Sequence, residues 1–162
     1  MAKYLIYITL FFALCIKNEA QCNMSYLKSR ITDRIVLDNL NNKDTSFYLF
    51  HISTGMNVKK WRGDQFNDTV LFKFRKDCYL RFYLIAKGLE PGQSCLKLIT
   101  NSGKINTEPR LVVKEILNSG KDEEISVFEY YLKETEDMLL VLNQNTNSKG
   151  CSFAAAIQFR RL

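Results

Sequence analysis

The 162-residue chain contains a single histidine and only seven glycines, and this scarcity removes several kinds of chemistry. A catalytic triad or a histidine-containing metal site would have to use His51, which lies inside an aromatic segment, and no Cys-x-x-Cys pair is present. The glycine patterns of phosphate-binding and dinucleotide-binding loops are also absent. The acidic groups at 122–124 and 134–137 fall in expected turns, where solvated charge explains them better than a glycosidase site does. We therefore expect no enzyme activity, no metal and no cofactor.

Long apolar runs are missing everywhere except at the start of the chain. Residues 1–20 combine Lys3, an apolar stretch over 5–16 and the small residue Ala20, which are the parts of a secretory signal peptide. The stretch is too short for a membrane anchor, and no later segment is apolar enough to span a bilayer. The sequence therefore predicts a secreted, extracellular protein that begins at Gln21 and does not insert into membranes.

Clustered positive charge is missing as well. Removal of residues 1–20 takes away two of the 23 basic residues and one of the 17 acidic residues, which leaves 21 against 16, a net charge of +5. These charges are scattered, and no run of lysine and arginine resembles a nucleic-acid-binding segment. A nucleic-acid partner is thus not expected, although weak attraction to anionic glycans or cell surfaces remains open.

Four cysteines remain after the signal peptide, and an even number in an exported domain predicts two disulfides. They are Cys22, Cys78, Cys95 and Cys151. If Cys78 and Cys95 lie at opposite ends of adjacent strands, they are about 20 Å apart, too far for a bond. This favours Cys95–Cys151 together with Cys22–Cys78, unless the chain crosses over at 88–92. Two Asn-x-Ser/Thr triplets, at Asn23 and Asn67, predict N-glycosylation.

Alternating apolar residues predict many short strands. The central segment, 69–86, alternates in two runs around Lys76 and Asp77, the pattern of a half-buried β-hairpin. Its first run places Val70, Phe72 and Phe74 on one face, and its second run places Leu80, Phe82 and Leu84 on one face with Cys78. Further strands are expected at 45–52, 95–100, 110–117, 125–132, 138–142 and 152–159.

Eight or nine such strands predict an all-β fold, an antiparallel β-sandwich or jelly roll, formed by a single domain over residues 21–162. A closed β-barrel is the alternative. The segment after Cys22 is ambiguous, because Leu27, Ile31 and Ile35 have helical spacing while 31–37 could be a first strand. A short N-terminal helix is therefore possible.

Two features predict a recognition surface. The segment 53–68 has no clear period and carries the only tryptophan and the tripeptide Arg62-Gly63-Asp64, a weak integrin-type motif. The second face of the hairpin carries tyrosines and an arginine, which form an exposed patch unless the N-terminal segment covers them. The expected partner-binding residues are Trp61, Arg62, Asp64, Tyr79, Arg81 and Tyr83.

These features predict a secreted, non-enzymatic binding module that recognises an extracellular protein or glycan. The alternative is a carrier of a small apolar ligand, which requires an enclosed apolar cavity of several hundred Å³ in a barrel or between two sheets.

Overall fold

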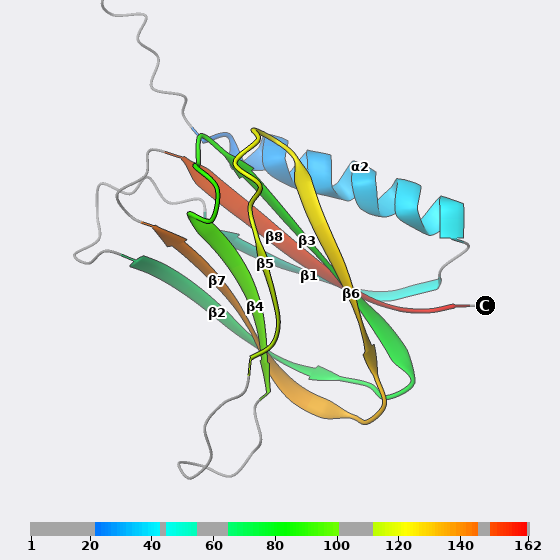
Figure 1. The fold of residues 1–162 in the computed structure, drawn as a ribbon. Coiled ribbons are helices and arrows are strands. Elements are labelled where there is room, and N and C mark those ends of the chain that lie inside the picture. Colours follow the sequence, from blue (N-terminus) through cyan, green and yellow to red (C-terminus); the bar gives the residue numbers. More distant parts are fainter. Residues whose placement is uncertain (1–21, 43–44, 55–64, 101–111, 146–149, 162) are drawn as a thin grey trace, which may run out of the picture.

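A computed structural model describes residues 22–42, 45–54, 65–100, 112–145 and 150–161, and these form one helix and eight strands (Figure 1). For residues 45–54, 65–68, 70 and 72 only the backbone is described. The elements are α2 (Met24–Asn42), β1 (Thr45–Thr54), β2 (Gln65–Phe74), β3 (Cys78–Lys87), β4 (Ser94–Thr100), β5 (Val112–Leu117), β6 (Ile125–Leu132), β7 (Glu136–Asn145) and β8 (Cys151–Arg160). Trp61, Arg62, Asp64 and the predicted signal peptide lie outside the described residues.

The strands form two antiparallel sheets, and their order is that of a jelly roll. The first sheet has the order β1-β8-β3-β6 and the second has the order β2-β7-β4-β5. Each of the pairs β1–β8, β2–β7, β3–β6 and β4–β5 is hydrogen-bonded, as in a long folded hairpin whose successive strand pairs alternate between two sheets. The predicted β-sandwich or jelly roll is therefore confirmed.

The prediction of a hairpin over 69–86 is wrong, because β2 and β3 belong to different sheets. The connection between them bonds to the neighbouring β6–β7 connection: the Asp77 N–H donates to the Leu132 carbonyl at 2.8 Å, and the Lys76 N–H donates to Thr135 Oγ1 at 3.2 Å. The two connections thus cross from sheet to sheet side by side. A short polar turn between two alternating runs is compatible with a hairpin and with such a crossing, so the local pattern could not separate them.

The space between the sheets is filled by one apolar core. Phe82 and Phe128 stack across β3 and β6 with ring centroids 4.5 Å apart. The buried members of this core are Phe74, Leu80, Phe82, Leu84, Leu96, Leu98, Phe128, Leu132, Met138, Leu140, Leu142, Ala154 and Ala156. The predicted inward face of the second run, with Leu80, Phe82 and Leu84, is confirmed.

A buried asparagine holds together the β3–β4 and β5–β6 connections, which also cross between the sheets. The side chain of Asn118 accepts a hydrogen bond from the Ser94 N–H at 2.9 Å and donates one to the Glu90 carbonyl at 2.9 Å. Its backbone N–H donates to the Ser94 carbonyl at 3.0 Å. Because these bonds satisfy polar groups that would otherwise be buried unpaired, they fix the path of both crossings.

Helix α2 lies across the outer face of the first sheet (Figure 1). It begins after Asn23, whose side-chain oxygen accepts from the Tyr26 N–H at 3.0 Å and so caps the helix. Leu27, Ile31 and Ile35 are buried against the sheet, so the helical interpretation of this segment is confirmed and the alternative first strand is wrong. The second apolar cluster comprises these three residues with Tyr83, Ile85, Cys151, Phe153, Ala155, Ile157 and Phe159.

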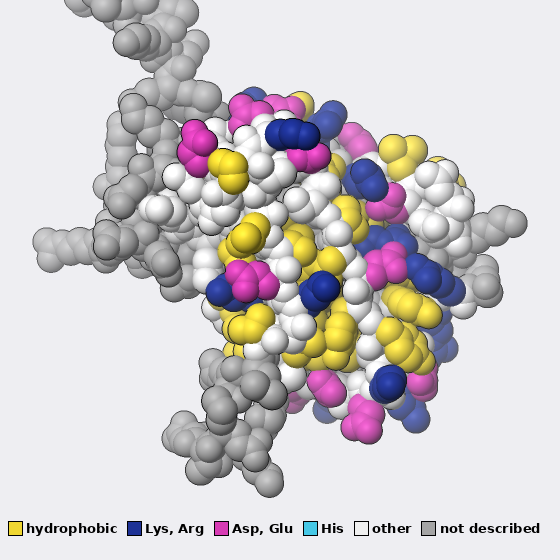
Figure 2. All heavy atoms as spheres, viewed as in Figure 1, with side chains coloured by type: hydrophobic (Ala, Val, Ile, Leu, Met, Phe, Trp, Pro, Cys, Tyr) yellow, Lys and Arg dark blue, Asp and Glu magenta, His cyan; other side chains and the backbone are white. Residues whose placement is uncertain are grey.

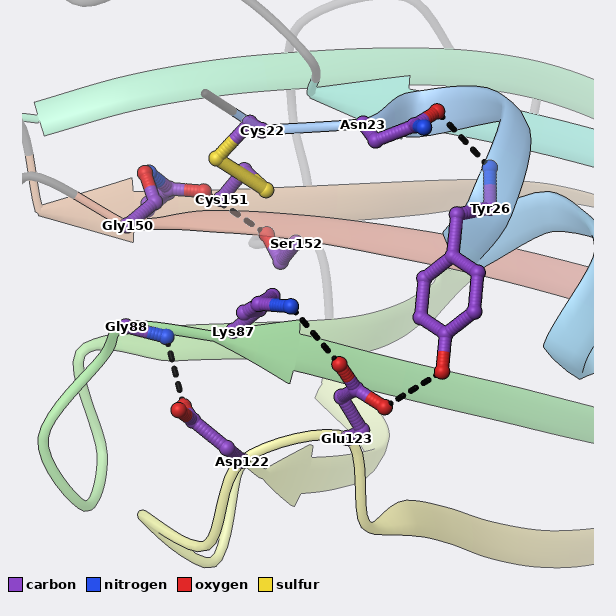
Figure 3. The surroundings of a disulfide bond; sticks show 11 residues. Cys22, Asn23, Tyr26, Lys87, Gly88, Asp122, Glu123, Gly150, Cys151 and Ser152 are labelled. Atoms are coloured by element: carbon purple, nitrogen blue, oxygen red, sulfur yellow. Dashed lines mark hydrogen bonds and ion pairs between the residues drawn. A yellow bond between two sulfur atoms is a disulfide. The ribbon is translucent and has the colours of Figure 1, made fainter. Parts of the chain in front are cut away.

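The disulfide of the described structure joins Cys22, just before α2, to Cys151 at the start of β8 (Figure 3). Cys78 and Cys95 are free and buried. The predicted pairs Cys95–Cys151 and Cys22–Cys78, and the prediction of two disulfides, are therefore wrong. The expectation that Cys78 and Cys95 do not bond to each other is confirmed.

The positions of the cysteines explain these pairings. Cys151 lies beside Lys87, at the end of β3 opposite to Cys78, so strand direction was predicted correctly for this pair of strands. Cys95, however, is in the second sheet and pairs with Leu117, and its thiol donates to a carboxylate oxygen of Glu115 at 2.9 Å. Cys95 and Cys151 are thus held in different sheets.

A charged cluster supports the disulfide corner (Figure 3). The Lys87 ammonium lies 2.8 Å from one carboxylate oxygen of Glu123, and the Tyr26 hydroxyl donates to the other at 2.7 Å. The hydrogen bond from Lys87 lowers the pKa of Glu123 and raises that of Lys87, so both stay charged. Nearby, a Cβ on Gly150 would meet the backbone oxygens of Lys87 and Gly88, which restricts this position to glycine. The start of α2 is therefore fixed to the end of β3 and to the β5–β6 connection.

Candidate functional site

The structure places the described members of the expected recognition surface under α2 or beside it. Arg81 is 2% exposed and Tyr83 is fully buried, so the prediction that they form an exposed face of β3 is wrong, and coverage by the N-terminal segment is confirmed. Tyr83 lies in the apolar cluster under the helix, and its hydroxyl donates to an Asp38 carboxylate oxygen of α2 at 3.2 Å. Burial raises the pKa of Tyr83 well above its usual value. Only Tyr79 of the three is partly exposed.

Tyr79 and Arg81 belong to a cluster on the outer face of the first sheet, here called the tyrosine–arginine cluster: Tyr79, Arg81, Glu129, Tyr131, Phe159 and Arg161. Its polar centre is the Glu129 carboxylate. One oxygen lies 2.6 Å from a terminal nitrogen of Arg81, and the other lies 2.6 Å from a terminal nitrogen of Arg161. Register explains the first contact, because Arg81 and Glu129 are direct cross-strand partners on β3 and β6.

Aromatic rings surround this ion triad. The Tyr79 ring lies 5.0 Å from the Tyr131 ring and 5.5 Å from the Phe159 ring, measured between centroids. The guanidinium of Arg161 lies 4.6 Å from the Tyr79 centroid, and that of Arg81 lies 4.4 Å from the Phe159 centroid. Such stacking restricts both arginines to planar contacts and fixes the orientation of the carboxylate between them.

The outer part of the cluster faces solvent. Tyr131 is 43% exposed, and the Arg161 side chain is 49% exposed. Partial burial and the nearby Asp77 carboxylate raise the pKa of Tyr131, so its hydroxyl stays protonated at neutral pH. The accessible groups are thus an aromatic ring, a guanidinium and a carboxylate that accepts hydrogen bonds. They can stack and hydrogen-bond with a ligand, and the cluster contains no nucleophile–base pair.

A second candidate surface, the open face, is the outer side of the second sheet, over which no described element lies. Cross-strand register sets its side chains in rows that run across all four strands. One row is aliphatic: Leu71, Leu139, Ile99 and Val112. Beside it runs a row that carries an ion pair: Thr69, Val141, Lys97 and Glu115. Figure 2 looks onto the side that carries β5 and β6, where apolar side chains reach the surface between charged ones.

Sequence reasoning missed the open face and four of the six residues of the tyrosine–arginine cluster. Glu129 and Tyr131 alternate on β6 just as Tyr79 and Arg81 do on β3, but pairing the two strands requires the sheet order. Within the described residues, no group of three or more histidine, cysteine, aspartate or glutamate side chains could hold a metal ion. No helix in the described ranges is long and apolar enough to cross a membrane.

No protein-family model and no curated protein matches this chain. Among solved structures, one described as "CBM4 structure and function" is similar, with 16% sequence identity and a TM-score of 0.33. The alignment covers 60% of this chain and 61% of that chain, so it spans about three fifths of the length of the solved protein.

Proposed function

We propose that this protein is a secreted, non-enzymatic binding module that recognises an extracellular glycan through the tyrosine–arginine cluster. The observation that carries the proposal is the exposed Tyr131 ring beside a guanidinium and a carboxylate held at 2.6 Å. The apolar face of a sugar ring can stack on the tyrosine, while its hydroxyls accept from Arg161 and donate to Glu129. Because the ion triad fixes these groups before a ligand arrives, little conformational entropy is lost on binding.

The size of the cluster favours a glycan over a protein partner at this site. A stable protein interface buries about 800 Å² on each partner and involves about 20–30 residues a side. The solvent-facing part of the cluster consists of Tyr131, Arg161, Glu129 and the edge of Tyr79. Four side chains match one or two sugar rings better than they match a protein epitope.

The filled core favours recognition over the alternative, a carrier of a small apolar ligand. The described inner faces of both sheets bring large side chains together, and Phe74, Leu80, Phe82 and Met138 have no exposed surface. Such packing occupies the space in which a carrier would hold its ligand. Secretion is supported by the disulfide, since such bonds persist in oxidising compartments.

The test uses the secreted protein on an array of neutral, sialylated and sulfated oligosaccharides, followed by titration of the best hit. Tyr131→Ala should weaken binding at least about tenfold, which is about 1.4 kcal/mol. Tyr131→Phe should stay within about threefold, because it keeps the ring. Leu117→Ala, at an exposed position of β5 in the second sheet, is the matched control and should have no effect.

An affinity for the oligosaccharide that is unchanged in both Tyr131→Ala and Arg161→Ala would refute the site. A protein captured from the native fluid whose binding falls with both variants would instead change the ligand class from glycan to protein. The intact mass of the secreted protein tests export separately: it should correspond to a start near Gln21 with added glycan at Asn23 and Asn67.

A further inference from the structure

The two sheets of the sandwich differ in how their outer faces are covered. Helix α2 covers the part of the outer face of the first sheet that is formed by β1, β8 and β3, whereas no described element lies over the open face of the second sheet. In its aliphatic row, Leu71 is 56% exposed and Val112 is 51% exposed. Between these two edge-strand residues Leu139 is 8% exposed, so the row reaches the surface at its two ends. Exposed aliphatic side chains on a sheet face that no described element covers are the kind of feature that marks an interaction site.

The charges on the open face balance each other. Lys97 lies 3.6 Å from Glu115 in the row next to the aliphatic one, and Lys73 is the cross-strand partner of Asp137 on its other side. The whole chain, in contrast, carries a net charge of +6. On a face whose charges are paired in this way a second copy can approach with little repulsion.

The size of the open face also suits a second copy. Strands lie about 4.8 Å apart and rise about 3.3 Å per residue, so four strands of the length of β4 cover about 19 by 23 Å. This flat footprint is about 400 Å², half of the about 800 Å² of accessible surface that each partner buries in a standard interface, and side-chain relief adds to it. Face-to-face stacking at about 10 Å is the usual way in which sheets bury their apolar sides.

We propose that the open face is the interface of a twofold-symmetric dimer of this chain, with the aliphatic rows of two copies packed together. A twofold axis makes the contact self-complementary, so that Lys97 of each copy can pair with Glu115 of the other copy. The contact closes after two copies, because α2 occupies the corresponding face of the first sheet. The two tyrosine–arginine clusters then lie on opposite outer sides of the dimer, so that one dimer can bind two glycans at the same time.

Sedimentation equilibrium of the secreted protein over a concentration range of about 1–100 μM tests the proposal. The wild type should have twice the mass of one chain. Leu71→Asp and, separately, Val112→Asp should weaken the association at least tenfold while the urea-unfolding midpoint of the monomer is kept. The matched control is Leu40→Asp, which adds the same charge at a 72% exposed leucine of α2 and should leave the dimer intact.

Charge variants distinguish a specific interface from general stickiness. Lys97→Glu and Glu115→Lys should each weaken self-association at least tenfold, whereas an equimolar mixture of the two should form heterodimers with an affinity near that of the wild type. A monomeric wild type at 100 μM, equal dissociation by Leu40→Asp, or failure of the mixture to associate would overturn the proposal. Dimerisation only after enzymatic deglycosylation would also overturn the proposal for the native protein. Asn67 is two positions before Thr69 on β2, so by strand alternation a glycan on it belongs to the open face.

Discussion

Removal of the Cys22–Cys151 disulfide by paired serine substitutions should lower the stability of the fold by several kcal/mol. The two cysteines are 129 positions apart, so the bond closes nearly the whole described domain into one loop. For a loop of this length the chain-entropy model gives about 5 kcal/mol at 25 °C, and measured values are usually about 2–4 kcal/mol. We expect a loss of about 3–5 kcal/mol.

The loss should be global, because other contacts still hold α2 in place without the disulfide. Leu27, Ile31 and Ile35 remain buried against the first sheet, and each such side chain contributes about 1.5–3 kcal/mol. The hydrogen bonds from Tyr26 to Glu123 and from Tyr83 to Asp38 also remain. The variant should therefore fold with α2 docked and unfold at a lower denaturant concentration.

Equilibrium unfolding in urea, followed by far-ultraviolet circular dichroism, measures this loss. With a slope of about 1.5 kcal/mol per molar urea, a loss of 3–5 kcal/mol moves the midpoint down by about 2–3 M. The matched control is the pair Cys78→Ala and Cys95→Ala, which removes the same number of thiols without a crosslink and should cost less than about 2 kcal/mol. A serine variant within about 0.5 kcal/mol of the wild type, or a control that loses as much, would refute the reasoning.

Three further outcomes follow from buried groups. Native protein should not react with iodoacetamide at pH 8, whereas unreduced protein in urea should show two alkylated thiols by mass, because Cys78 and Cys95 are free and buried. Burial raises the pKa of Tyr83, and burial with a hydrogen bond to a carboxylate raises that of Cys95 to about 12, above their unfolded values. The contribution of these two protonated groups to the free energy of unfolding should therefore be fully present below about pH 9 and be lost as the pH rises toward 12. Urea midpoints measured over this pH range should fall less in Tyr83→Phe than in the wild type. Ile31→Ala, at 1% exposure, should cost about 2–5 kcal/mol in the same urea assay, and Leu40→Ala less than about 0.5 kcal/mol.

Strand positions could be predicted from the sequence because alternation is a local property. All six strands expected outside the central segment coincide with observed strands; the segment 138–142 expands to Glu136–Asn145, and 110–117 overlaps Val112–Leu117. Alternation also separates the two faces of β8: Ala154 and Ala156 face the core between the sheets. Phe153, Ala155, Ile157 and Phe159 share the face covered by α2.

Strand partners could not be predicted, because pairing depends on distant segments. The run after Asp77 has the same pattern whether it pairs with β2 or, as the structure has it, with β6 and β8. The error in the disulfides has the same origin: strand direction was sufficient for Cys151, but the sheet that holds Cys95 was unknown. The covering helix was undecided because three apolar residues at helical spacing also fit a short strand.

Because the first strand pairs with the last, the first sheet cannot be completed until the whole chain has been synthesised. β4 and β5 are neighbours in sequence, whereas β1 must wait for β8, roughly a hundred residues later, or about 5–20 s at ordinary rates of synthesis. Such distant contacts also slow folding itself. If the chain enters an oxidising compartment as it is made, Cys22 can react with Cys78 or Cys95 before Cys151 has been made, and later exchange would have to undo such crosslinks. Under that condition, a thiol–disulfide exchange catalyst that acts after the last strand has been made would speed maturation.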